Sequence, residues 1–160
     1  MKSHFYSAQI KWTGNRGSGT DHYKNYDRSH LVSFKNKTDL QCSSDPAFRG
    51  DPAKYNPEEL LLASLSSCHM LWYLHLCADA GVVVTEYIDE PKGVMMELES
   101  GKGKFTEVIL YPRVVIINEL MKQKALDLHQ AAHRNCFIAN SVNFEVKHIP
   151  TVEFSKKSAS

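Results

Sequence analysis

The sequence lacks a marked excess of charge of either sign. Its 160 residues contain 19 lysines and arginines against 18 acidic residues, which leaves a formal net charge of +1. Such a balance provides no general electrostatic attraction to nucleic acid or to an anionic membrane. We therefore expect neither as a partner, and we expect binding specificity to come from a local site.

Two kinds of hydrophobic segment are also missing. We expect no membrane-spanning helix, because acidic and histidine side chains interrupt the most apolar stretch, 56–77, within the roughly 20 residues that a span requires. The first residues, MKSHFYSAQIKW, lack the apolar core of a signal peptide. Both absences predict a cytoplasmic protein, whose cysteines are normally reduced.

A C-x-x-C pair is missing, so the cysteine spacing fits neither a zinc ribbon nor a thioredoxin motif. The four cysteines lie at positions 42, 68, 77 and 136 and form no C-x-x-C pair. A chain of this length can bury a core without disulfides or a structural metal. Isolated buried cysteines are usually inert, so a chemical role for any of them has to be argued from its surroundings.

The order of the expected elements indicates one α+β domain over residues 1–160. Strand-like segments are separated by turns at spacings that suit antiparallel hairpins. Residues 41–55 contain two Asp-Pro steps and are expected to form a loop, and the tail at about 155–160 is expected to be disordered. Strands are expected at 4–12, 30–36, 82–90, 93–100, 105–116 and 142–149, and helices at 56–81 and 118–136.

The first helix has a well-marked beginning and no polar face. Asn56 can cap it, Pro57 suits its first turn, and Glu59 completes a capping-box pattern. Large apolar side chains, including Met70 and Trp72, surround the helix on all sides, so it has to be buried. A chain of this size has little material to enclose such a helix, and we expect a homodimer to do so.

Spacing excludes a bond between the two cysteines of this helix. Cys68 and Cys77 are nine residues apart, which places them on opposite faces and roughly 13 Å apart along the axis. If Cys68 has a disulfide partner, Cys136 at the end of the second helix is the better candidate, and Cys42 is the other choice.

Histidines offer an alternative, a zinc site. His129, His133 and Cys136 fall at i, i+4 and i+7, and Cys68 and His75 are also seven residues apart. Two such helix faces could enclose a zinc ion with sulfur and nitrogen ligands. Buried histidines are more often hydrogen-bonded core or interface residues. A non-enzymatic metal- or ligand-binding dimer therefore stays open as an alternative function.

The segment NPEELLLASLSSCHM resembles the OsmC/Ohr family, named for osmotically inducible protein C and organic hydroperoxide resistance protein. The family signature is N-P-E-x-L, followed by small and apolar residues and a cysteine ten positions after the first glutamate. Glu58 and Cys68 match this spacing. A second family cysteine follows a later helix, and AAHRNCFIANSVNFEV places Cys136 there. The resemblance extends from IKWTGNRGSGT to VNFEV, essentially the whole chain.

The resemblance implies a thiol-dependent peroxidase without a cofactor. Cys68 would attack an organic hydroperoxide and Cys136 would resolve the product as an intramolecular disulfide, which a dithiol reductant would reopen. An arginine held by Glu58 would favour the Cys68 thiolate. Arg49 is our first choice and Arg16 the second, because each lies near the arginine position of one branch of the family. The implied fold is an intertwined homodimer, with antiparallel sheets wrapped around central helices.

Two residues depart from the family pattern. Phe137 follows the second cysteine where many members have proline, and His69 follows the first where phenylalanine is common. Lipid-like hydroperoxides would suit the apolar surroundings, and His69 could either tune Cys68 or pack against it.

Overall fold

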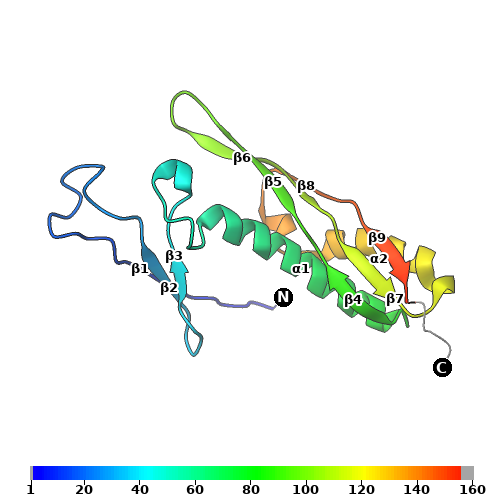
Figure 1. The fold of residues 1–160 in the computed structure, drawn as a ribbon. Coiled ribbons are helices and arrows are strands. Elements are labelled where there is room, and N and C mark those ends of the chain that lie inside the picture. The colour runs from blue at the N-terminus through cyan, green and yellow to red at the C-terminus, as the bar shows by residue number, and fades with distance from the viewer. Residues whose placement is uncertain (1, 156–160) are drawn as a thin grey trace. The chain divides into compact units, whose positions relative to one another are not determined.

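The computed structural model describes residues 2–155, which divide into two compact units at 1–61 and 62–160. Figure 1 labels the helices and strands and colours them in chain order. Helices and strands both contribute, as an α+β fold requires. Apart from Ser155, the tail expected to be disordered lies outside the described residues.

The N-terminal unit contains a three-stranded antiparallel sheet of order β1-β2-β3. β1 is shorter than the expected strand at 4–12, and β3 overlaps the first residues of the loop expected at 41–55. A short 3-10 helix, η1 (Pro46–Phe48), follows β3. The strands are β1 (Gln9–Trp12), β2 (His30–Ser33) and β3 (Leu40–Cys42).

The connection between β1 and β2 folds back on itself beside Gly14. The Trp12 indole Nε1 donates to the carbonyl oxygen of Asp27 at 2.7 Å, and the Asp27 amide donates to the carbonyl oxygen of Gly14 at 2.8 Å. A Cβ atom on Gly14 would lie 1.8 Å from the Asp27 carbonyl oxygen. Only glycine therefore permits this close approach of two backbone segments.

Helix α1 (Pro57–Asp79) begins with the predicted capping box. The Asn56 side-chain Oδ1 accepts from the Glu59 amide at 2.8 Å, and Glu59 Oε2 accepts from the Asn56 amide at 3.1 Å. At the other end Gly81 adopts a positive φ of 72°, and the Val82 amide donates to the carbonyl oxygen of Cys77. The predicted start and stop of this helix are therefore confirmed.

The length and composition of α1 correct one expectation from the sequence. With 23 residues, the helix is long and apolar enough to cross a membrane, whereas we expected no such segment from the sequence. The core helix of a soluble protein passes the same test, so the finding by itself does not assign α1 to a membrane.

The C-terminal unit contains two three-stranded sheets, of order β4-β7-β9 and β5-β6-β8. β5 pairs antiparallel with β6, as the hairpin spacing predicted, and β4 pairs antiparallel with β7, but β6 pairs with β8 and β7 with β9 in parallel. The expectation of purely antiparallel sheets is therefore wrong. The strands are β4 (Val84–Ile88), β5 (Lys92–Glu97), β6 (Gly103–Leu110), β7 (Arg113–Ile116), β8 (Glu145–His148) and β9 (Thr151–Phe154).

The parallel pairs follow from the helical crossover between β7 and β8. This crossover contains η2 (Glu119–Met121), α2 (Lys122–Asn135) and η3 (Ala139–Ser141), and a helical connection of this length can return the chain to the end of the sheet from which it started. Pro112 divides the expected strand at 105–116 into β6 and β7. Hydrogen bonds from Ile149 to Leu110 and from Thr151 to Pro112 continue the pairing across the break.

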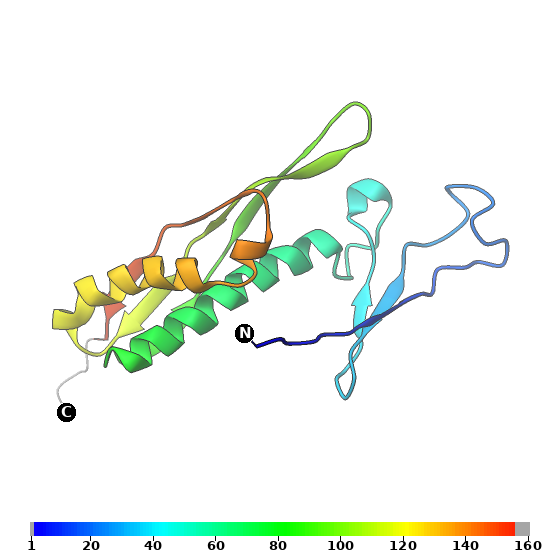
Figure 2. The same cartoon turned by 180° about the vertical axis from the view of Figure 1, so that it is seen from behind.

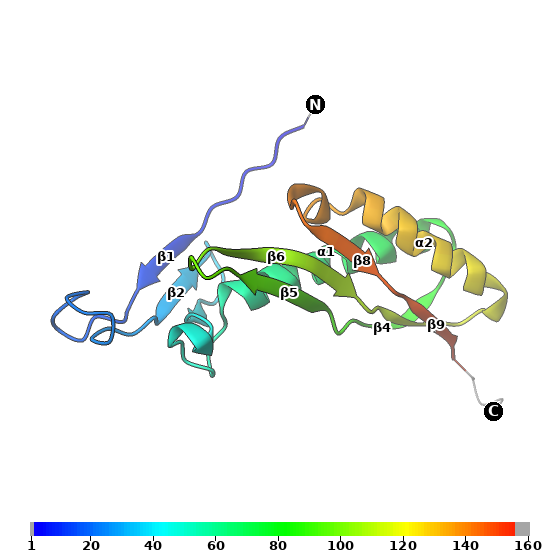
Figure 3. The same cartoon turned by 90° about the horizontal axis from the view of Figure 1, so that it is seen from above.

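The core of this unit lies between the two helices and the β4-β7-β9 sheet. Figures 2 and 3 show α1 and α2 side by side on the same face of the strands. The buried residues come from both helices, from β7 and β9, and from the connection between α1 and β4: Tyr73, Cys77, Val82, Val114, Ile116, Ala125, Leu128, Ala132 and Val152. The position of Cys68 and Cys136 relative to one another is set by this packing of α1 and α2.

Candidate functional site

The structure brings Cys68 of α1 and Cys136 of α2 together. Both are free thiols, and they lie close enough that Cys68 contributes to the raised pKa of Cys136. Cys136 is the C-terminal cap of α2, where the backbone changes from helical to extended, and its Sγ accepts from the Ala139 amide at 3.4 Å. The end of α2 therefore holds the Cys136 thiol next to Cys68 of α1.

The two thiols have different environments. Cys136 is buried, with 1% of its surface exposed, whereas Cys68 is partly exposed. Burial, followed by the interaction with the neighbouring Cys68 thiol, raises the pKa of Cys136 to about 11. At neutral pH Cys136 is therefore a protonated thiol and a poor first nucleophile.

Aromatic contact secures the helices next to the thiols. Trp72, one turn after Cys68, meets the ring of Phe137 edge to face, with ring centroids 5.5 Å apart. Phe137 directly follows Cys136, where the sequence departs from the family pattern. The departure thus contributes a packing contact between α1 and the end of α2.

Cys77 and Cys42 are buried apart from this pair. Cys77 belongs to the core of the C-terminal unit, and burial raises the pKa of its thiol. Cys42 is fully buried in the N-terminal unit, and burial raises its pKa as well. Both fit the description of an inert core cysteine.

Four histidines form a cluster beside the thiol pair. His69 of α1 and His129 of α2 are buried, and His69 Nε2 lies 3.1 Å from His129 Nδ1. His133 and His148 complete the cluster, with their ring centroids 5.1 Å apart. Sequence reasoning missed the contribution of His148, although the alternation in β8 places it on the same inward face as Val146.

The four histidines and the cysteines do not assemble into the zinc site considered from the sequence. Among residues 2–155, no group of three or more potential ligands has an arrangement that could hold a metal ion. His75 is exposed and lies 3.5 Å from the Asp79 carboxylate. Its side chain contributes to none of the contacts of the cluster.

The two candidate arginines and Glu58 belong to the N-terminal unit. Arg16 is engaged with Asp27 through two hydrogen bonds, one of them 3.0 Å from Nε to Oδ2, and this ion pair lowers the pKa of Asp27. One buried carboxylate oxygen of Glu58, Oε2, has no hydrogen-bond partner within the described part of the chain. Neither arginine is paired with Glu58 there.

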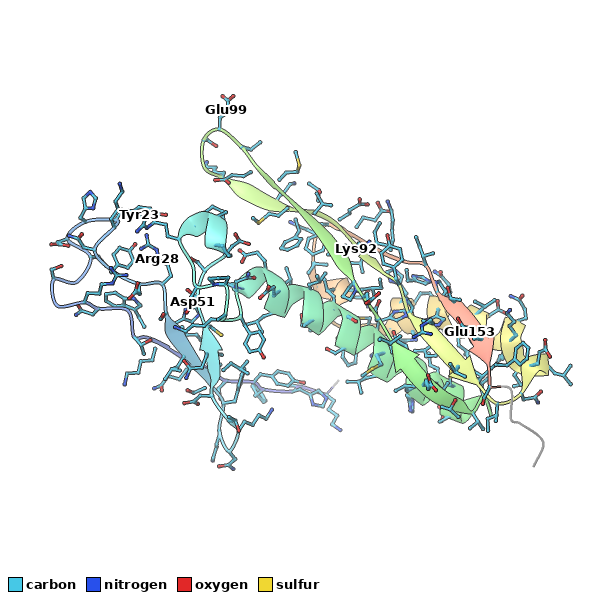
Figure 4. All side chains as sticks on the ribbon, in the orientation of Figure 1. Tyr23, Arg28, Asp51, Lys92, Glu99 and Glu153 are labelled. Atoms are coloured by element: carbon cyan, nitrogen blue, oxygen red, sulfur yellow. The ribbon has the colours of Figure 1, made fainter. Side chains whose placement is uncertain are left out.

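Arg49 lies beside a polar cavity of about 320 Å³ within the N-terminal unit. It caps η1 in the left-handed conformation, with φ of 67°, and its guanidinium lies 6.0 Å from the centre of the Tyr23 ring. Arg28 also lies over the Tyr23 ring, and both Arg28 and Asp51 line the cavity. Figure 4 labels Tyr23, Arg28 and Asp51. Unlike Arg16, Arg49 has no carboxylate partner among the described residues.

Comparison with known proteins identifies relatives over almost the whole chain. Residues 50–150 match the family model described as OsmC-like protein. An OsmC-like protein of unknown function from Vibrio cholerae is 33% identical, with a TM-score of 0.82 over 92% of this chain and 99% of that one. No curated protein matches the chain.

Two organic hydroperoxide resistance proteins share the fold at lower identity. The protein from Elizabethkingia anophelis is 21% identical, with a TM-score of 0.67 over 97% of this chain and 100% of that one. OhrB of Bacillus subtilis is 20% identical, with a TM-score of 0.60 over 92% of this chain and 98% of that one. The family model covers well over half of the chain and the Vibrio cholerae relative nearly all of it, so the protein belongs to the OsmC-like family.

Proposed function

We propose that the protein is a thiol-dependent peroxidase that reduces organic hydroperoxides. The contact between Cys68 and Cys136 is the observation that carries the proposal, because it joins a partly exposed thiol to a buried one. Membership of a family that includes hydroperoxide resistance proteins supports the same conclusion.

The environments of the two thiols support a division of labour. The Cys68 thiolate attacks the terminal oxygen of the hydroperoxide, forming an S–O bond as the O–O bond breaks, and the alkoxide takes up a proton and leaves as an alcohol. Cys68 is then a sulfenic acid. The sulfur of Cys136 attacks the Cys68 sulfur, and its proton leaves with the hydroxyl group as water. A dithiol reductant of the cell then restores both thiols.

Activation of Cys68 requires a cation in this proposal, and Arg49 is the better candidate. The charge of Arg16 is already neutralised by Asp27, whereas Arg49 has no carboxylate partner among the described residues. The buried, unpaired oxygen of Glu58 would be stabilised by a guanidinium, as the family resemblance implies. We further propose that the protein works in the cytoplasm as a homodimer.

Peroxide consumption by cysteine variants tests the proposal. Cys68→Ser should abolish reduction of an organic hydroperoxide in the presence of a dithiol. Cys77→Ser is the matched control, because it changes a cysteine of the same helix that is buried in the core, and it should retain activity if it folds. Activity in Cys68→Ser equal to that of the wild type would overturn the proposal.

A further inference from the structure

The histidine cluster, defined as His69, His129, His133 and His148, is a buried group that the proposed chemistry does not use. It draws on three elements, since His69 belongs to α1, His129 and His133 to α2, and His148 to β8. The ring of His148 lies 5.5 Å from that of His69 and 6.5 Å from that of His129. Four imidazoles therefore share one small region, in which His69 and His129 are buried and His133 and His148 are half-buried.

The hydrogen bond at the centre of the cluster depends on neutral rings. Between His69 Nε2 and His129 Nδ1 one nitrogen must donate and the other accept, because a neutral imidazole carries one N–H group. If both rings were protonated, two N–H groups would face each other. His69 and His129 expose 1% and 0% of their surface, so water has little access to either charge.

The groups around the cluster offer no compensating negative charge. Tyr73 of α1 stacks on His129 with centroids 3.8 Å apart, and Tyr87 of β4 lies next to Tyr73. Burial raises the pKa of both phenols, so they stay neutral. The charges that act on the pKa values of His69 and His129 are those of the other histidines, and no carboxylate of the described chain is among them.

Acid therefore opposes the closed cluster. Burial, and secondly the neighbouring imidazoles, lower the pKa of His69 to about 4 and that of His129 to about 3. An opened segment binds protons near the ordinary value of about 6.5, so the closed form loses stability as pH falls from about 6.5 toward 4. At pH 7 and above its contribution is complete.

The same cluster connects the two helices that carry the thiols. His69 directly follows Cys68, and His129 lies on α2 two turns before Cys136. The His69–His129 bond and the stacking of Tyr73 on His129 join α1 to α2, as does the contact between the thiols. Separation of the imidazoles would thus move α2 and withdraw Cys136 from Cys68.

We propose that the histidine cluster is an acid-releasable clamp, which holds the end of α2 against α1 at neutral pH and frees it in acid. The clamp concerns the structure of the reduced protein. Its consequence, slower formation of the Cys68–Cys136 disulfide in acid, rests on the proposed function.

Amide hydrogen exchange of the reduced protein between pH 7.5 and 5 tests the clamp without any peroxide. After correction for the intrinsic exchange rate, protection of α2 should fall at least about tenfold, because each buried imidazole can contribute up to tenfold per pH unit. The double variant His69→Gln, His129→Asn places amide groups near the bonded nitrogens and cannot be protonated. Its α2 protection should depend on pH much less than that of the wild type, with a remainder from His148, whose pKa burial also lowers, whereas the exposed control His75→Gln should behave like the wild type.

Identical pH dependence in the wild type and the double variant would overturn the clamp. If the double variant does not fold, nitrogen NMR of the wild-type imidazoles provides the test. His69 and His129 should stay neutral at pH 5.5 while α2 is closed, and protonation of both near pH 6.5 with α2 still protected would also overturn the proposal. Loss of α2 protection in a protein without peroxidase activity would support the clamp and contradict only the proposed function.

Discussion

At the scale of single residues, the neighbours of each cysteine thiol and each arginine guanidinium decide which role we propose for it. Cys136 is buried next to Cys68, which makes it a poor first nucleophile and a well-placed second one. Arg16 is committed to Asp27, whereas Arg49 is not committed to a carboxylate in the described residues. The pattern of the elements favoured Cys136 over Cys42 as the partner of Cys68, but the roles proposed for Cys68, Cys136 and Glu58 came from the family resemblance.

The choice of arginine leads to a prediction about Cys68 reactivity. Arg49→Ala should slow alkylation of Cys68 at pH 7 and move its pH–rate profile upward by roughly one to two pH units, because loss of the cation disfavours the thiolate. Glu58→Ala should cause a smaller shift in the same direction. Stopped-flow alkylation of Cys77→Ser protein, with the modified peptide identified by mass, measures this. A large shift in Arg16→Ala with none in Arg49→Ala would contradict the assignment.

At the scale of elements, local signals predicted α1 and failed for the sheets. The capping box at Asn56 and the glycine at 81 are contacts within a few residues, so the sequence pattern was enough to fix both ends of the helix. Parallel pairing of β6 with β8 depends on the crossover through α2, which no strand pattern reveals. β9 was missed because four residues, two of them exposed polar ones, carry too little periodicity. His148 joined the cluster only through tertiary packing.

The cluster between α1 and α2 predicts how stability depends on pH. Between pH 6 and 4.5 the free energy of unfolding should fall by about 1.4 kcal/mol per pH unit for each of His69 and His129, since the unfolded state binds protons that the buried rings do not. Urea unfolding at fixed ionic strength measures the slope, and His129→Asn should reduce it by about 1.4 kcal/mol per pH unit, the share of one imidazole. The exposed control His75→Gln should keep the wild-type slope. If His129→Asn also kept it, the account of buried neutral imidazoles would be contradicted.

At the scale of the whole molecule, exposed apolar side chains point to a second copy of the chain. Leu71 of α1 is 62% exposed, and every residue of β5 is exposed, including Met96 at 56%. A helix that is apolar on all sides is rarely left open to water. The apolar helix alone led us to expect a dimer from the sequence. The exposed apolar side chains of α1 and β5 are the surface at which we expect the second copy to bind.

Sedimentation tests the assembly. The reduced protein should sediment as a dimer at micromolar concentration, because burial of these faces is worth roughly 25 cal/mol for each Å² of apolar surface. Leu71→Glu should weaken the association, whereas Glu153→Gln, an exposed change in β9, should leave it unaltered. A folded, stable monomer at this concentration would contradict the prediction.

The central claim, that Cys68 is oxidised and Cys136 resolves it, is tested most directly by intact mass after one equivalent of organic hydroperoxide. The wild-type protein should lose about 2 Da and yield a peptide that links Cys68 to Cys136. Cys136→Ser should instead gain oxygen on Cys68, first as sulfenic and then as sulfinic acid. An unchanged mass, or a disulfide that involves Cys42 or Cys77 in place of this pair, would contradict the account.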